Sequence, residues 1–583
     1  MSERNPFNPG ADGSSHKRTL IAFALMALVL IATPYLFKSG VPPQPTKSAK
    51  SVTPSVSQTT PPSNTPPQET AAASKKSAAS KKSGDPSSGT RAAHDEQQIV
   101  IDTDVYRVVF SNRGGVVTSW TLKKYLDAAG KPLELVNAAA APKVWYPFSL
   151  EFRGNKPSVN LNQSLFVAEK RPDGLGVTFE HANGGATAKK TFEFQRDGYL
   201  TQVATEVLQN GTALPHSVAW RGGFGDFAVQ NASGLQHAIR YDANEGKLHT
   251  EVPKEAKDGP VSRDGNFSFA GLDDQYFAAV FLPNDNQTQT TLFDDYVPTP
   301  FDKSEQQFIG TAIGGDGANQ LALYVGPKDV DLLKQVNPKL EQIVDFGMFW
   351  FLAKPLFLVL RFLNQQYVHN YGWAIIIATF FINFLLFPLR LMSMKSMKRM
   401  QLLQPEIQKI NERYKSIPMR DPRMQQKNQE TMDLYKRNGA NPMAGCLPLL
   451  IQMPFLFAFY KVLSVAIEMR GASWLWVHDL SQPEHLSLKI LPVLLIVTGF
   501  LMQKMTPSVG MDPQQRRMMM MMPLVMGFFF YNQSSGLVLY WLTGNLMGMA
   551  QQYFFNKTML APEQPALANT GAVKASPKKP GRK

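Results

Sequence analysis

The sequence predicts a multidomain protein: a polytopic α-helical membrane core with six transmembrane helices, and a β-sandwich domain on the periplasmic side of the membrane. The mean hydropathy is only −0.19, so the apolar residues must be concentrated in blocks. These blocks lie near the N-terminus and after residue 342, whereas residues 97–335 show the two-residue period of strands. The net charge of +14 is typical of proteins that bind nucleic acid or anionic lipid, and also of membrane proteins with basic cytoplasmic loops.

Residues 1–37 are predicted to be a cytoplasmic stub and an uncleaved transmembrane anchor. Lys17–Arg18 precede the apolar run Thr19–Phe37. A cleaved signal peptide is the alternative, but no small-x-small cleavage site precedes Pro34 and no lipobox cysteine is present. The basic residues before the run place the N-terminus in the cytoplasm.

Residues 38–96 are predicted to be a disordered linker. They are rich in Pro, Ser, Thr, Ala and Lys. Such a composition buries too little apolar surface to offset the entropy of the chain.

Residues 97–335 are predicted to form the β-sandwich. Asp197–Gly198 lies between two alternating runs and indicates a hairpin. Further apolar alternation marks strands at Val116–Leu122, Tyr276–Leu282 and Leu321–Val325, and glycine pairs mark turns at Gly222–Gly225 and Gly314–Gly317. The chain has a single cysteine, so this domain must fold on its hydrophobic core without an internal disulfide.

Residues 342–367 are apolar but contain Lys354 and Arg361, which are seven residues apart and share one helix face. An amphipathic helix lying along the membrane fits this pattern better than a span.

Five further transmembrane helices are predicted, at 371–391, 442–463, 488–505, 518–531 and 536–555, with a periplasmic loop at 464–487. Several are shorter than the roughly 20 residues of a usual span. Residues 392–441 hold eleven Lys or Arg and five Asp or Glu. This segment, Arg516–Arg517 and the basic tail 556–583 fall on one side, which is the cytoplasm by the positive-inside rule. Both termini then lie in the cytoplasm of a cell that has a periplasm.

The segment 392–441 is predicted to be a basic helical hairpin with its turn at Ser416–Arg420. Apolar residues recur along one helix face: Met394, Met397, Met400, Leu403, Ile407, Ile410 and Tyr414. The hairpin either merely connects two spans, or its adaptable methionine face binds apolar segments of other proteins. Its basic face suits anionic lipid or ribosomal RNA.

Polar residues recur inside the predicted spans, including Asn383, Arg390, Gln452, Asn545 and Gln551. Each alone is explained by a hydrogen bond between helices. Their number over five spans favours a hydrated cavity. Arg390 follows Pro388, so it either faces this cavity or extends to the membrane interface.

The sequence offers no motif for bond-making chemistry. It has no Walker A, HExxH or GxSxG motif and no Cys/His cluster. We therefore expect no enzyme activity, no catalytic residue, no cofactor, no metal and no small-molecule substrate.

Several motifs together resemble those of a known family. They are Asn441-Pro442, Gly445-Cys446-x-Pro448, Gln452-Met453-Pro454, Ser535–Trp541, Asn545 and Gln551-Gln552, with Leu403-Gln404-Pro405 and Ile407 in the hairpin and Asp102–Asp104 before Gly114-Gly115. In this combination the chain resembles the YidC family of membrane protein insertases, which is related to mitochondrial oxidase-assembly and chloroplast insertases. The similarity covers nearly the whole chain.

This resemblance implies a periplasmic β-supersandwich, five core helices around a groove open to cytoplasm and lipid, and a hairpin that meets incoming substrates. It implies nascent membrane proteins, the Sec translocon and the ribosome as partners, and the inner membrane as location. The family usually carries an arginine in the groove, and alignment on Thr379 and Pro388-Leu389 puts Asn383 there. Our hypothesis is that Arg390 supplies the positive charge from the rim of the groove while Asn383 keeps the groove hydrated.

The candidate contacts are hypotheses of two kinds. Groove and substrate contacts are Thr379, Asn383, Arg390, Gln452, Tyr540, Trp541 and Asn545, and hairpin contacts to substrate or ribosome are Met394, Met397, Met400, Leu403 and Ile407. A secondary transporter and a periplasmic binding module on an anchor are the rival functions. A transporter is disfavoured because this sequence shows no evident inverted repeat and no buried carboxylate for coupling ions. A binding module on an anchor would leave five spans unexplained.

Overall fold

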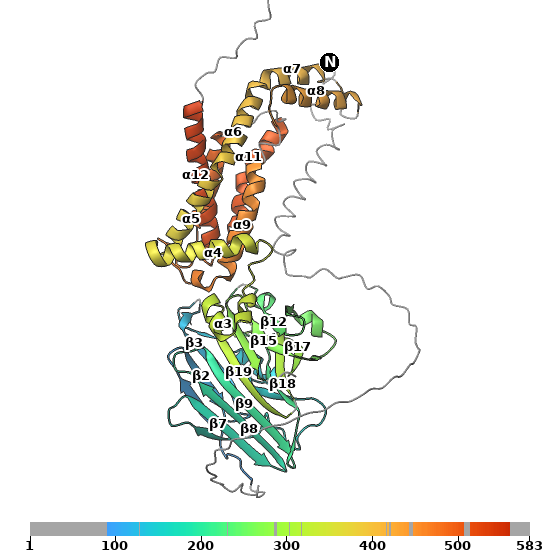
Figure 1. The fold of residues 1–583 in the computed structure, drawn as a ribbon, viewed down its shortest axis with the longest axis vertical. Helices are drawn as coiled ribbons and strands as arrows, with labels where there is room; N and C mark the ends of the chain where they lie inside the picture. The colour runs from blue at the N-terminus through green and yellow to red at the C-terminus, as the bar shows by residue number, and fades with distance from the viewer. Residues whose placement is uncertain are drawn as a thin grey trace, which may run out of the picture. The chain divides into compact units, whose positions relative to one another are not determined.

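The computed structural model describes residues 90–127, 129–229, 231–284, 288–301, 304–315, 317–415, 417–418, 421–441, 447–505 and 513–559 (Figure 1). The predicted anchor, most of the predicted linker, the motif residues Pro442 to Cys446 and most of the basic tail lie outside these residues. The last part of the predicted linker is attached to the strands, because Arg91 pairs with Ala182 through backbone hydrogen bonds of 2.8 and 2.9 Å. The ordered domain therefore begins several residues before residue 97.

Three antiparallel sheets follow. The first has the order β1-β2-β3-β4 and comprises β1 (Gln98–Asp102), β2 (Tyr106–Ser111), β3 (Val116–Leu126) and β4 (Pro132–Glu134). The second has the order β13-β12-β15-β16-β19-β9-β8-β7-β6 with β10 beside β9, and comprises β6 (Val167–Lys170), β7 (Gly176–Asn183), β8 (Ala186–Phe194), β9 (Leu200–Gln209), β10 (Thr212–Ala213), β12 (His237–Asp242), β13 (Lys247–Glu251), β15 (Phe267–Asp273), β16 (Phe277–Pro283) and β19 (Ala318–Pro327). The third has the order β14-β17-β18-β11-β5 and comprises β5 (Ser149–Phe152), β11 (His216–Trp220), β14 (Val261–Gly265), β17 (Thr288–Pro298) and β18 (Glu305–Gly315).

The predicted hairpin around Asp197–Gly198 is confirmed, since β8 and β9 pair antiparallel with Phe194 opposite Thr201. An aromatic core joins the three sheets. Trp120 of β3 lies 5.8 Å from Phe194 of β8 and 6.1 Å from Trp220 of β11, measured between ring centroids. Contact between rings from all three sheets is the layered packing that the alternating pattern predicts for a sandwich.

Lys190 is an unusual member of this core. Alternate residues of β8 point inward, and this period carries Lys190 to the buried face, where it is 1% exposed. Its ammonium donates to the carbonyl oxygens of Gly114 and Phe148 at 2.7 Å each and of Gly115 at 3.4 Å. Burial lowers the pKa of Lys190 to about 7.

The stability of the protein should therefore rise with pH between about pH 7 and pH 9. The unfolded lysine has the higher pKa, so the unfolded state binds more protons in this window, and the slope is at most about 1.4 kcal/mol per pH unit. Urea unfolding followed by tryptophan fluorescence at both pH values measures it. Lys190→Met should abolish the difference; an equal pH slope in this variant would show that other groups cause it.

One short α-helix lies between β4 and β5 in the chain, and the other described α-helices follow β19. The α-helices are α2 (Ala141–Val144), α3 (Val330–Val336), α4 (Trp350–Leu363), α5 (Tyr371–Leu385), α6 (Phe387–Leu402), α7 (Gln404–Arg413), α8 (Arg423–Arg437), α9 (Leu447–Val465), α10 (Ile490–Met505), α11 (Pro513–Phe530) and α12 (Ser535–Met559). In the described part of the chain, no single helix has both the length and the apolar character needed to cross a membrane. Residues Trp350–Val368 and Tyr371–Leu385 meet these criteria only as a pair, which is bent by 118° at the break.

Two predicted boundaries differ from the structure. The segment predicted as a helix from 342 to 367 becomes α-helical only at Trp350, and its cations Lys354 and Arg361 form ion pairs with Glu341 and Asp331. The helix predicted over 371–391 breaks at Leu386, because Pro388 cannot continue the hydrogen bonding of α5 and instead occupies the first turn of α6. Helix α6 then runs without interruption across the predicted boundary at residue 391.

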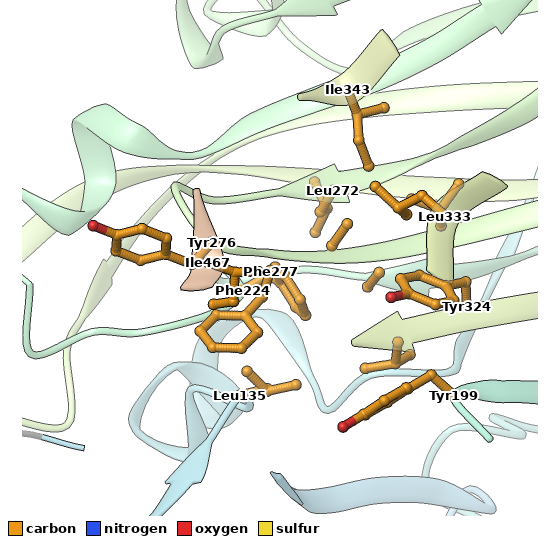
Figure 2. Close-up of a cluster of buried hydrophobic side chains, with 14 of the residues drawn as sticks. Leu135, Tyr199, Phe224, Leu272, Tyr276, Phe277, Tyr324, Leu333, Ile343 and Ile467 are labelled. Atoms are coloured by element: carbon orange, nitrogen blue, oxygen red, sulfur yellow. The ribbon is translucent and has the colours of Figure 1, made fainter. Parts of the chain in front are cut away.

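The buried apolar cluster extends from the strands to the segment after α9. Ile467 of that segment belongs to the same cluster as Tyr276 and Phe277, and Figure 2 shows the three side chains next to one another. Gln275 also donates to the carbonyl oxygen of Ser464 at 2.8 Å. The strand domain therefore packs directly on the end of α9.

Candidate functional site

The break between α5 and α6 positions the first group of predicted site residues. Arg390 lies in the first turn of α6 and is half-buried. Its Nη1 donates to Gln551 Oε1 of α12 at 2.8 Å and to Asn383 Oδ1 of α5 at 3.4 Å. The structure thus brings together the two predicted groove residues Asn383 and Arg390, and adds Gln551. We call these three residues the Arg390 site.

A backbone carbonyl of the preceding turn and the guanidinium of Arg390 orient the amide of Asn383. Its Nδ2 donates to the carbonyl oxygen of Thr379 at 2.8 Å, which leaves Oδ1 directed at the guanidinium. Thr379 is fully buried, and its hydroxyl donates to the carbonyl oxygen of Ile375 at 2.6 Å. Thr379 therefore supports Asn383 and has no free hydroxyl of its own.

Within the described residues, Arg390 forms no ion pair, and its side-chain partners are the amides of Asn383 and Gln551. Removing a cation from water costs several kcal/mol, and amide dipoles offset this cost only in part. A charge-assisted bond to an incoming carboxylate is stronger than one to an amide, so the site can attract an anion.

The other predicted groove residues form separate contacts around α12. Gln452 of α9 donates to the hydroxyl of Tyr540 at 2.9 Å, and Asn545 donates to Thr498 of α10 at 3.4 Å. Trp541 packs on Phe530 of α11 with ring centroids 5.3 Å apart. Along α12, positions 540 and 551 lie on nearly the same face but about three turns apart, and position 545 faces another direction, so the three residues contact different neighbours. In the described residues, no hydrogen bond joins these pairs to Arg390.

The predicted hairpin contacts are buried or partly buried in the structure. Met394, Met400, Leu403 and Ile407 are buried, and the last three belong to a cluster with Tyr435 and Ala440 against which Met397 also packs. In this structure the methionine face therefore stabilises α6, α7 and α8 against each other and is not an open surface.

This packing predicts a difference between two neighbouring substitutions. Ile407 is 4% exposed and Leu402 is 68% exposed. Ile407→Asp should destabilise the hairpin by about 2–5 kcal/mol, as other losses of a buried aliphatic side chain do. Leu402→Asp should have little effect on protease cleavage of α7 and α8. Equal sensitivity of the two variants to protease would contradict the packing.

Two residues of α12 beside the guanidinium of Arg390 were not among the predicted contacts. Gln551 was noted as a polar residue and as part of the Gln551-Gln552 motif, and Gly548 was not singled out. Neither was identifiable from the sequence, because their proximity to Arg390 depends on how α12 packs on α5.

The described residues hold no group of three or more His, Cys, Asp or Glu side chains able to bind a metal ion. The amides and guanidinium of the Arg390 site offer hydrogen bonds and charge but no nucleophile.

Comparisons with known proteins cover both halves of the chain. Residues 98–359 match the family described as YidC periplasmic domain, and residues 362–562 match the family described as 60Kd inner membrane protein. The chain is 34% identical to a membrane protein insertase YidC of Geotalea daltonii over 94% of this chain and 100% of that protein. It is also 34% identical to the one of Syntrophus aciditrophicus, over 93% and 99% of the two chains.

Among solved structures, an active YidC insertase with its first transmembrane domain resolved aligns at 20% identity and a TM-score of 0.36, over 80% of this chain and 94% of that one. The assignment itself depends on the family matches and the sequence relatives, which extend over nearly the full length of the chain. The chain belongs to the YidC family of inner-membrane proteins, with a periplasmic domain built largely of β-sheet.

Proposed function

We propose that this chain is a membrane protein insertase that inserts, folds and helps assemble inner-membrane proteins without nucleotide hydrolysis. Its named relatives are insertases. The observation that supports the mechanism is the Arg390 site, a half-buried guanidinium with amide partners at 2.8 and 3.4 Å. A cation that is not neutralised by an acid attracts the acidic flank of an incoming segment.

Insertion of a substrate span is favourable without nucleotide hydrolysis. A substrate span gains roughly 0.3–0.6 kcal/mol for each Leu, Ile, Val or Phe that enters lipid. The barrier lies in moving the polar flank through about 30 Å of hydrocarbon. A polar site inside the helices shortens this path, and the substrate helix then leaves into the bilayer beside the groove-lining helices.

We propose the topology that the charge pattern predicts: six spans, namely the anchor Thr19–Phe37 and the segments 371–391, 442–463, 488–505, 518–531 and 536–555, with both termini in the cytoplasm. In the described part of the chain, each single helix is shorter or less apolar than a usual membrane span. Short spans thin the bilayer locally, which lowers the insertion barrier further.

The proposed partners are nascent membrane proteins, the Sec translocon, the ribosome and anionic lipids. The exposed cations of the hairpin, such as Lys395 and Lys409, suit ribosomal RNA and lipid headgroups. The buried apolar face of the hairpin contacts substrate only if the hairpin opens.

The test is reconstitution of the purified full chain in liposomes without nucleotide. Short single-span substrates with acidic, uncharged or basic translocated tails are offered, and protected fragments are counted after protease treatment. We expect insertion of the acidic tail and poor insertion of the basic tail. No insertion above protein-free liposomes would refute an autonomous insertase, and equal insertion of all three tails would refute the role of charge.

A periplasmic binding function is the second candidate. A pocket of about 720 Å³ in the strand domain is lined by polar residues that include Arg153, His216, Asp264 and Gln289. Deletion of residues 97–330 separates the two functions. An insertase should keep much of its activity in the liposome assay, whereas a binding module should lose its function.

A further inference from the structure

The backbone of Arg390 and its guanidinium lie at different levels along the helices. Arg390 follows Asn383 by seven residues, which corresponds to about 10 Å along a helix. Helical side chains tilt toward the N-terminus of their helix, so Arg390 extends back toward Asn383. The guanidinium therefore lies at the level of Asn383, although its backbone is closer to the predicted cytoplasmic end.

Helix α12 provides space for this guanidinium at Gly548. A Cβ atom added at Gly548 would lie 2.8 Å from Arg390 Nη2 and 2.9 Å from the methyl carbon of Met502. Both atoms are the ends of flexible side chains. A methyl group at this position would thus displace the guanidinium without disturbing the backbone.

Gln551 provides the acceptor. It follows Gly548 by three residues and lies on the same face of α12. Its Oε1 accepts from Arg390 at 2.8 Å, while its Nε2 faces the backbone carbonyl oxygen of Asn383 at 3.4 Å. The second contact fixes the orientation of the amide, because the nitrogen must face the carbonyl and the oxygen must face the cation.

We propose that Gly548 and Gln551 are positioning residues, which hold the guanidinium of Arg390 beside Asn383 and so place the charge where an arginine at position 383 would place it. This inference rests on the proposed insertase function and names the residues that set its charge selectivity. An arginine on α6 alone would be free to extend to the membrane interface. Contact with α12 holds it at depth.

Two substitutions, each with a matched control on α12, test the proposal in the liposome assay. Gln551→Glu neutralises the guanidinium, whereas Gln552→Glu adds the same charge at a residue that bonds to Asn556 of its own helix at 3.0 Å. Gly548→Ala displaces the guanidinium. Its control is Gly544→Ala, because a Cβ atom at Gly544 would contact only Gln452 Nε2, at an ordinary van der Waals distance of 3.9 Å. The readout is the ratio of acidic-tail to uncharged-tail insertion, which a general loss of folding would not change.

We expect Gln551→Glu to lower this ratio about tenfold, the size of one lost charge-assisted hydrogen bond, and Gly548→Ala to lower it by a smaller factor. The control variants should keep the wild-type ratio. Equal changes in Gln551→Glu and Gln552→Glu, or no change in either, would overturn the proposal while leaving wild-type insertion intact.

A substrate-free measurement decides the same question if the wild-type chain inserts nothing. In thermal unfolding of the full chain in detergent, the effects of Arg390→Ala and Gln551→Leu should be non-additive, because they remove the same bond. The effects of Arg390→Ala and Gln552→Leu should add. Additivity in both pairs would exclude the positioning contact whatever the insertion assay gives.

Discussion

Replacement of Arg390 by alanine should reduce insertion of an acidic-tailed single-span substrate about tenfold or more. The guanidinium is the cation of the Arg390 site, where it bonds to Gln551 and Asn383. Loss of a charge-assisted hydrogen bond to substrate is worth about 1.5–3 kcal/mol, which corresponds to roughly 10- to 100-fold in binding. Insertion into liposomes measured by protease protection gives the value.

The control for this loss is Arg423→Ala. Arg423 is exposed and bonds to Asp421 at the turn of the hairpin, so its removal should leave insertion unchanged. The double variant Asn383→Arg with Arg390→Ala returns an arginine to the same place and should recover much of the activity. Full activity of Arg390→Ala alone would show that polarity and membrane thinning suffice without the charge.

Replacement of Arg470 by alanine should give the largest loss of stability. Arg470 lies after α9 and forms an ion pair with Asp226 of the strand domain at 2.7 Å, in which the two side chains are 11% and 6% exposed. It also donates to the carbonyl oxygen of Leu126 at 2.8 Å and lies over the ring of Phe277 at 5.1 Å. Its removal leaves Asp226 buried without a counter-charge, which costs about 3–5 kcal/mol.

Thermal unfolding of the full chain in detergent measures this loss, and protease cleavage near Ser464 shows whether the contact between α9 and the strands has opened. Arg153→Ala is the matched control. Its ion pair with Asp264 at 3.3 Å is exposed on both sides, and such pairs contribute about 0–1 kcal/mol. Similar shifts in the two variants would mean that the buried pair does not hold the junction.

The strand domain was largely predictable because its strands and turns are specified by residues that are close together in the sequence. Alternation along β8 and β9 sets which side chains face inward, and Asp197–Gly198 marks the turn between them. The same alternation places Lys190 in the core. Its three carbonyl partners come from distant loops, so no sequence pattern indicates how its charge is accommodated.

The helices were predictable in approximate position but not in their breaks, since the structure divides the predicted span 371–391 and the first hairpin helix among α5, α6 and α7. Pro388 is visible in the sequence, yet whether it ends a span or lies within one depends on the packing around Leu386. The methionine face of the hairpin shows the same limit. Periodicity identifies one apolar face, but only the packing of α8 shows that this face is covered.

By itself, the sequence determined the sheet-rich domain, the apolar blocks, the positive charge between them and the motifs that resemble the YidC family. It also identified Asn383 and Arg390 as candidate residues of the groove. Only the tertiary structure decided that Gln551 and Gly548 lie beside the guanidinium of Arg390 and that Gln452 and Asn545 form separate contacts. The physical reason is that periodicity fixes the face of a helix on which a residue lies, whereas the neighbour of that face depends on the packing of all the helices together.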